Sequence, residues 1–259
     1  MLDLKQIETF YPQGLRPFKR NLLREYLQYK ILEAVFSSDL SGKLSFMGGT
    51  AIHIIHSNTR FSEDLDFDNF GISKKDFEQM SKHIKNKLKL EGCNVEIKNS
   101  FEGAYRAYIK ISDILYDNKL SAHKEEKLLI QVDTEPQKAS YQPDKVILNK
   151  FDVFISINAV PPDILLAQKI YAIFMRKRPL GRDFYDAIFL FGKTKPNLGY
   201  LKAKLGITGI PELKTRLLKK CEGLNFKQLA RDVEQFLFVP QDAKKVLLFS
   251  DYISRLDYA

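Results

Sequence analysis

Two aspartates separated by one residue, Asp64 and Asp66, form the pattern in this sequence that is best suited to chemistry. Side chains alternate between the two faces of a β-strand, so both carboxylates would project from the same face of one strand. Neighbouring carboxylates repel each other unless a cation lies between them, and Mg²⁺ prefers such oxygen ligands. Magnesium also leaves positions open for substrate phosphates, as phosphoryl transfer requires. An isolated Asp-x-Asp is a weak signal, because paired acids are also common at exposed strand edges.

A glycine pair followed by a threonine, Gly48–Gly49–Thr50, lies upstream between an apolar stretch and a helical one. Glycines let the backbone approach a ligand closely, and the N–H groups at a helix start attract phosphates. The Thr50 hydroxyl is expected to cap the helix or to donate to a phosphate oxygen. A phosphate-binding turn followed by a carboxylate pair is less common by chance than either alone. The combination suits a reaction that holds a triphosphate together with a metal.

Two further residues are expected near these aspartates. Asp133 ends the apolar strand Lys127–Asp133, which is a natural neighbour of the Asp64 strand. It would be a metal ligand or the base for the attacking hydroxyl, and the alternative is a strand-end acid that faces solvent. Ser62 is expected on the Asp64 side by strand alternation, where it would contact the nucleotide. A phosphate added to Ser62 would then compete with the nucleotide, although a simple hydrogen bond to the backbone is the plainer alternative.

The later part of the chain contains a second polar group. Lys169 lies inside the apolar stretch 164–178, where a lysine costs desolvation free energy unless it reaches solvent or meets an anion. In the next helix Arg182 can reach a phosphate, while Asp183 and Asp186 share one helix face. The alternative is a plain helix start at which the dipole favours Asp183. Spacing alone leaves both interpretations open.

The elements that must position these residues follow from hydrophobic periodicity. A helix is expected over 17–38, a strand over Leu44–Met47, a helix over 50–57 and a strand over Leu65–Phe67. A lysine-rich helix over 74–91 precedes strands expected over Asn94–Lys98, Arg106–Ile111, Lys127–Asp133 and Val153–Ile157. Beyond Pro161 helices are expected over 163–177, 182–192, 211–221, 225–237 and 242–256. We therefore place a soft boundary near residue 160, between an α/β half and an all-helical half.

Composition limits the possible classes of protein. The 259 residues are long enough for one large domain or two small ones, and the 41 Lys and Arg exceed the 32 Asp and Glu to give a net charge of +9. This excess favours a polyanionic partner, although a lysine-rich, solvated surface would look the same. Two cysteines cannot build a disulfide framework or a cysteine-based zinc site. With no signal-peptide pattern and no membrane-length apolar run, we expect a cytoplasmic protein.

The segment FMGGTAIHIIHSNTRFSEDLDF, residues 46–67, resembles the G-G-T…R-[FY]-S-x-D-[LI]-D-F signature of the AbiEii/AbiGii-type nucleotidyltransferase toxins. This family lies within the DNA polymerase β-like superfamily. The segments EYLQYKIL (25–32) and QKIYAIFMRKRPLGRDFYDAIFL (168–190) also resemble it, so the likeness covers roughly residues 20–192.

The resemblance implies an α+β fold with a nucleotidyltransferase-type mixed sheet in a catalytic domain (1–160), followed by an all-helical domain (161–259). It implies metal ligation by Asp64 and Asp66, and also by Asp133, which lies in a loosely defined part of the family pattern. Gly48, Gly49 and Thr50 would form the phosphate turn. Lys169 would neutralise triphosphate charge, and Asp183 would orient the triphosphate or the acceptor. His53 and His56 lie three residues apart on the helix after the turn, a spacing that could chelate a metal, but packing or surface roles explain them better.

The activity implied is Mg²⁺-dependent transfer of a nucleoside monophosphate from an NTP to a hydroxyl, with release of pyrophosphate. The family suggests a toxin of a toxin–antitoxin or phage-defence (abortive infection) system, with a cognate antitoxin protein and an RNA acceptor such as a tRNA 3′ end. A protein hydroxyl or a small molecule such as an aminoglycoside is an alternative acceptor. A catalytically silent nucleotide- or nucleic-acid-binding module is the alternative class, and the intact Asp64, Asp66 and Lys169 argue against it.

Overall fold

The computed structural model describes residues 1–256, and its chain divides into two compact units. The first unit comprises Met1–Ala51, Ser62–Lys138 and Pro143–Ala159. The second comprises Ile52–Phe61, Ala139–Gln142 and the chain from Val160 onward. The segment Ile52–Phe61, just before Asp64 and Asp66, therefore belongs to the second unit, although the residues on both sides of it in the sequence belong to the first.

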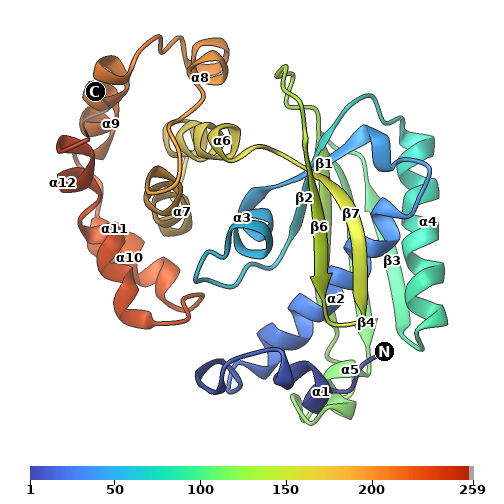
Figure 1. The fold of residues 1–259 in the computed structure, drawn as a ribbon. Helices are drawn as coiled ribbons and strands as arrows, with labels where there is room; N and C mark the ends of the chain where they lie inside the picture. The colour runs from blue at the N-terminus through green and yellow to red at the C-terminus, as the bar shows by residue number, and fades with distance from the viewer. Residues whose placement is uncertain (257–259) are drawn as a thin grey trace. The chain divides into compact units, whose positions relative to one another are not determined.

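Seven strands of the described residues form one mixed sheet in the first unit (Figure 1). The strand order across the sheet is β3 (Asn94–Ser100), β4 (Tyr105–Ser112), β5 (Leu128–Glu135), β2 (Leu65–Asn69), β1 (Leu44–Met47), β7 (Val153–Ala159) and β6 (Asp144–Lys150). Strand β2 runs parallel to β5 and antiparallel to β1. Its central place gives the residues of β2 a partner strand on each side.

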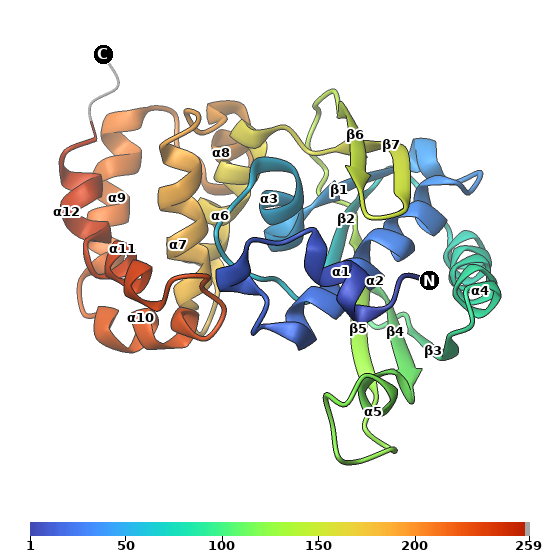
Figure 2. The ribbon, with the colours of Figure 1, turned by 60° about the horizontal axis from the view of Figure 1, so that its bottom comes forward.

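One face of the sheet is apolar because alternate residues of its strands are apolar. In β4, for example, Ala107, Ile109 and Ile111 are buried while the residues between them stay at least partly accessible. The helices α2 (Lys19–Phe36) and α4 (Lys74–Leu90) pack against each other and cover this face, as the two views show (Figures 1 and 2). The opposite face carries Asp66 and its polar neighbours.

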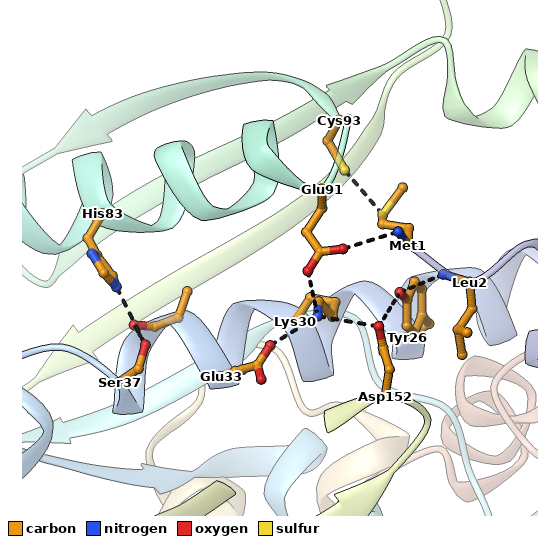
Figure 3. Close-up of polar contacts among 11 residues, drawn as sticks. Met1, Leu2, Tyr26, Lys30, Glu33, Ser37, His83, Glu91, Cys93 and Asp152 are labelled. Carbon is orange, nitrogen blue, oxygen red and sulfur yellow. Dashed lines mark hydrogen bonds and ion pairs between the residues drawn. The ribbon is translucent and has the colours of Figure 1, made fainter. Parts of the chain in front are cut away.

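A buried lysine anchors α2 to its surroundings (Figure 3). The Nζ of Lys30 lies 2.7 Å from Glu91 after α4, 3.0 Å from Glu33, and 3.5 Å from Asp152 between β6 and β7. Burial alone would lower the pKa of Lys30, but its hydrogen bonds to Glu91 and Glu33 raise that pKa above its ordinary value. The charge therefore holds three elements of the first unit together.

The remaining helices complete both units. In the first unit these are α1 (Leu4–Thr9) and α5 (Ile114–Asp117), and α3 (Gly48–His56) begins there and ends in the second unit. The second unit contains α6 (Pro162–Met175), α7 (Gly181–Phe191), α8 (Leu198–Leu205), α9 (Ile210–Cys221), α10 (Phe226–Glu234), α11 (Lys244–Leu247) and α12 (Phe249–Ser254). Among the residues described, none of these helices is long and apolar enough to span a bilayer.

The element predictions agree with this structure except at a few places. The strand over Leu44–Met47 is confirmed as β1, and the helix over 74–91 is confirmed as α4. The single helix expected over 242–256 is wrong, because a short 3₁₀ helix and two short α-helices occupy that stretch. Strand β6 was not anticipated, since its outward-facing Ile147 is 63% exposed and blurs the alternation of polar and apolar residues. The α+β fold with a mixed sheet and a helical C-terminal part is confirmed.

Candidate active site

Asp66 sits in a polar row that crosses the sheet. Asp66 in β2 is paired with Met47 of β1 on one side and with Asp133 of β5 on the other. Asp133 is paired in turn with Arg106 of β4. Neighbouring strands lie about 4.8 Å apart, so this register sets Asp66 and Asp133 side by side on one sheet face. The expectation that the Asp133 strand lies beside the aspartate strand is confirmed.

The phosphate turn predicted from the sequence lies directly against Asp66. Helix α3 begins at Gly48, so the glycine pair forms the first turn of the helix instead of preceding it. Gly48 has a φ of +80°, and a Cβ placed there would lie 2.9 Å from both Cβ and Cγ of Asp66. Only glycine fits this conformation in this space. The first N–H groups of a helix have no partner inside it, and together with the dipole they favour an anion at this end.

The segment that enters β2 is fixed by two side chains. The Thr50 hydroxyl donates a short hydrogen bond to the backbone carbonyl of Asp64, and Thr50 is fully buried. The Gln28 amide of α2 donates to the carbonyls of Ser62 and Glu63, at 3.0 Å each. Thr50 thus ties the first turn of α3 to Asp64, a use of the hydroxyl that differs from both the capping and the phosphate roles expected for it.

Ser62 lies outside the strand. Because β2 begins at Leu65, Asp64 and Ser62 both precede the strand. Strand alternation therefore places only Asp66 of the expected aspartate pair, and it cannot place the Ser62 hydroxyl beside Asp64. Its backbone carbonyl is bound by Gln28, as described above. A nucleotide contact or a modification of the Ser62 hydroxyl stays a prediction.

Asp133 is held by its neighbours on the same sheet face. The Nε of Arg106 donates to both of its carboxylate oxygens, at 2.9 and 3.1 Å, and the Gln131 amide donates at 3.0 Å. The hydrogen bond to Asp133 raises the pKa of Arg106 above its already high ordinary value, so this guanidinium is a permanent cation. Arg106 was not anticipated from the sequence, where it looks like any exposed strand residue.

A second cluster of charges forms within the second unit around Asp186. Arg60 approaches this carboxylate with two nitrogens, each 2.6 Å from an oxygen, and Asn58 donates to it at 2.9 Å. Lys169 of α6 lies 2.9 Å from Asp186 and 3.3 Å from Asp183. Arg176 lies 2.7 Å from Asp183. The lone lysine of the apolar helix therefore meets two anions, as its burial requires.

The electrostatics of this cluster depend on close pairing. Burial alone would raise the pKa of Asp186, but the charges of Arg60 and Lys169 outweigh it and hold that pKa below its ordinary value. Asp183 and Asp186 are both almost fully buried, as is Arg60. Three cations surround two carboxylates, which leaves one positive charge in excess. Such an excess favours an additional anion.

Other candidates of the second unit are more peripheral to this cluster. Arg182 lies in the first turn of α7, where it is partly exposed. The Nδ1 of His53 lies 2.7 Å from the carbonyl of Asn58, and its ring packs near Phe61 and Phe238. The expected packing role is therefore confirmed for His53.

Arg60 and Asp186 lie within segments that the sequence analysis singled out, but neither was predicted to have a functional role. Arg60 is the arginine of the R-[FY]-S-x-D segment, and it was not assigned a role because nothing in the sequence shows its partner. Asp186 was recognised only as a helix-face neighbour of Asp183. The ion pair between Arg60 and Asp186 joins positions 126 residues apart, which no local pattern reports.

A family model described as the nucleotidyl transferase AbiEii toxin of type IV toxin–antitoxin systems matches residues 30–206. The chain belongs to this family. The match spans the residues of both clusters described above, from the Gly48–Thr50 turn to α7. The protein is thus a nucleotidyltransferase toxin of the AbiEii family, and the resemblance seen in the sequence is confirmed.

Solved structures show the same fold at low sequence identity. MenT4, the nucleotidyltransferase toxin Rv2826c from Mycobacterium tuberculosis H37Rv, is 12% identical with a TM-score of 0.57, covering 99% of this chain and 91% of that one. JHP933 from Helicobacter pylori is 16% identical with a TM-score of 0.55, covering 90% and 91%. A putative nucleotidyltransferase from H. pylori is 16% identical with a TM-score of 0.54, covering 92% and 98%. A search of curated proteins gave no match.

Proposed function

We propose that this AbiEii-family protein transfers a nucleoside monophosphate from an NTP to an acceptor hydroxyl. The acceptor oxygen forms a bond to the α-phosphorus, the bond from that phosphorus to the bridging oxygen breaks, and pyrophosphate leaves. The observation that carries this proposal is the position of Asp66, which lies against Gly48 and directly beside Asp133. A helix start that favours phosphates and a row of carboxylates are thus in contact.

The donor set fits Mg²⁺ with the help of substrate. Asp66 and Asp133 are directly paired, Asp64 precedes Asp66 by two residues, and all three offer the oxygens that a hard cation prefers. Within residues 1–256, however, no three His, Cys, Asp or Glu side chains lie close enough together to hold a metal ion by themselves. Magnesium is usually held by one or two carboxylates plus substrate phosphates, and this set matches that pattern. When bound, it would neutralise charge on the phosphates.

The chain's own residues divide the remaining work. Asp64 and Asp66 would hold the metal, while Asp133 would be a third ligand or would take the proton from the acceptor hydroxyl. Backbone N–H groups of Gly48, Gly49 and Thr50 would orient the triphosphate.

The helical domain, residues 161–259, takes part in the same reaction. Lys169 would neutralise triphosphate charge, and Arg182 would contact a phosphate. Asp183, which lies 3.3 Å from Lys169, would orient the triphosphate or the acceptor. The single excess positive charge of the Asp186 cluster supports this assignment, because an incoming anion would balance it.

We infer that the acceptor is RNA, with a tRNA 3′ end as the specific candidate. The net charge of +9 supports a polyanionic acceptor. A toxin that modifies RNA would arrest growth or abort phage infection, and a cognate antitoxin protein would counteract it. No observation on this chain favours a protein or small-molecule acceptor over RNA.

A transfer assay with label on the α-phosphate tests this function. The purified chain is given each of the four NTPs separately, with Mg²⁺ and total cellular RNA, and both pyrophosphate and labelled RNA are measured. We expect both products with the wild type and neither with Asp66→Asn. Label in protein or in a small molecule would contradict the RNA acceptor. Binding of NTP without pyrophosphate release on any acceptor would contradict the enzyme itself.

A further inference from the structure

The polar face of the sheet extends well beyond Asp66. In β3, β4 and β5 every second residue points away from the face covered by α2 and α4 and remains exposed or half-exposed. We call six of these residues the β3–β5 platform: Lys98, Arg106, Tyr108, Lys110, Leu129 and Gln131. All of them lie within the first unit.

The strand register fixes how the platform is laid out. Lys98, Tyr108 and Gln131 are paired across the three strands and form one row. The next row toward the strand end contains Arg106, which is paired with Asp133, which is itself paired with Asp66. A ligand lying along these rows would therefore reach the carboxylates at one end.

The platform combines positive charge with apolar surface. Lys98 and Lys110 are exposed, and Arg106 keeps 35% of its side chain accessible although it is paired with Asp133. Leu129 is 42% exposed beside the half-exposed Tyr108. Glu96 lies on the same face, directly across from Lys110, and also forms an ion pair with Lys127 at 2.9 Å. This one acid therefore offsets part of the charge of the two lysines beside it, and the face keeps an excess of cations. Antiparallel sheets often have one polar face open to solvent. A solvent-accessible tyrosine and leucine among three cations are less usual on such a face, and exposed apolar surface of this kind often marks a binding site.

We propose that the β3–β5 platform binds the single-stranded end of the acceptor RNA and leads its terminal hydroxyl toward Asp66. Lys98, Lys110 and Arg106 match the backbone phosphates in charge. Tyr108 offers a ring on which a base stacks, and stacking of this kind tolerates any base. Sheets that present aromatic residues on an open face bind unstacked bases in this manner, whereas a double helix hides them. This inference rests on the proposed transfer to RNA.

The matched variants come from the same unit. Lys98→Ala with Lys110→Ala removes two charges from the platform, and Lys82→Ala with Lys89→Ala removes two exposed charges from α4, which covers the opposite face. Tyr108→Ala removes the ring, and Tyr108→Phe keeps it. None of these residues touches the proposed metal ligands. Thermal unfolding of each variant confirms that the fold is kept.

Binding is measured first, with the full chain, no NTP, and a short fluorescein-labelled single-stranded RNA of mixed sequence at several salt concentrations. We expect the platform lysine pair to weaken binding about tenfold and to reduce the slope of log affinity against log salt by about 1.4. Tyr108→Ala should weaken binding about tenfold with the slope unchanged, and Tyr108→Phe should restore it. The α4 pair should match the wild type. Equal losses in both lysine pairs, or none in either, would overturn the proposal.

Transfer kinetics separate this inference from the proposed function. We expect the platform variants to raise the KM for RNA while leaving kcat and the KM for NTP unchanged. Transfer to RNA with an unchanged RNA KM would overturn the platform and leave the function standing. Platform-dependent RNA binding without any transfer to RNA would support the platform and count against the function. Transfer to a protein that depends on the platform would show that the surface serves another acceptor.

Discussion

Gly48 and Asp66 approach each other so closely that a methyl group on the glycine would overlap the aspartate side chain. The ideal Cβ position lies 2.9 Å from Asp66 Cβ, and the φ of +80° already excludes most side chains. This contact joins the start of α3 to the start of β2, so the phosphate turn and Asp66 are held together. It also gives a physical reason for glycine at this position that does not depend on any ligand.

Gly48→Ala should therefore reduce the transfer rate by more than the loss of folded protein would explain. The alanine must push Asp66 aside, and a displacement of about 1 Å at a reacting centre can cost about 100-fold in rate. Gly71 provides the control, because its φ is +87° but nothing lies within 4 Å of a Cβ there. Gly71→Ala should cost only the backbone strain, about 1 kcal/mol, and keep full transfer. Equal kcat/KM in the two purified variants would show that the close approach of Gly48 to Asp66 does not affect catalysis.

Asp64→Asn and Asp66→Asn should each abolish transfer while the fold persists. Each substitution removes a charge that the metal needs, whereas without metal the neighbouring acids repel each other. The free energy of unfolding in EDTA should therefore be no lower than that of the wild type, as urea titration would show. Asp117→Asn, at an exposed acid of α5, should leave activity intact. Full transfer by either of the first two variants would remove that residue from the mechanism.

Lys169 should matter for NTP use beyond its ion pairs. Lys169→Ala should raise the KM for NTP severely, and Lys169→Arg should restore it only in part, because a guanidinium differs from an ammonium in shape and reach. Both ion partners of Lys169 are buried, so stability must be measured alongside activity. If Lys169→Met remains stable and active, the lysine has only a packing role.

Asp186 should make stability depend on pH at the acid end. Its pKa is lowered in the folded chain relative to about 3.9 in an unfolded one, so its contribution is complete above that value. The contribution is lost as the pH falls through the lower folded pKa. Unfolding free energies measured at a series of pH values from neutral to acid should show this loss.

Asp186→Asn provides the comparison for this pH dependence. The variant should be about 3–5 kcal/mol less stable near neutral pH, because Arg60 keeps its buried charge without the matching anion. It should then lose less stability than the wild type on acidification. The exposed Asp251→Asn should follow the wild-type curve throughout. If Asp186→Asn loses as much unfolding free energy as the wild type at acidic pH, other carboxylates dominate the pH dependence.

The helical part of the candidate machinery shows the limit of sequence patterns. The lysine at 169 was singled out because a charge inside an apolar helix needs an anion, and its two partners in α7 agree with that reasoning. Nothing in the sequence indicated that Arg60 is buried in an ion pair, since arginines in loops are usually exposed. Its burial follows from its bidentate pairing with Asp186 across 126 positions, and this pairing depends on the packing of the second unit.

The sequence by itself determined the family, the α+β class, most strands and helices, and the acids and glycines that chemistry would need. These features are local, because strand alternation, helical periodicity and the spacing of Gly48, Asp64 and Asp66 each extend over a short stretch of sequence. The sequence also indicated that the Asp133 strand neighbours the aspartate strand, but only tertiary structure decided the register that pairs Asp133 with Asp66. Tertiary structure alone also decided that Arg106 holds Asp133, that Thr50 binds the carbonyl of Asp64, and that Arg60 pairs with Asp186. The physical reason is that strand order and buried ion pairs join residues far apart in the chain, and such contacts are selected by the packing of whole elements.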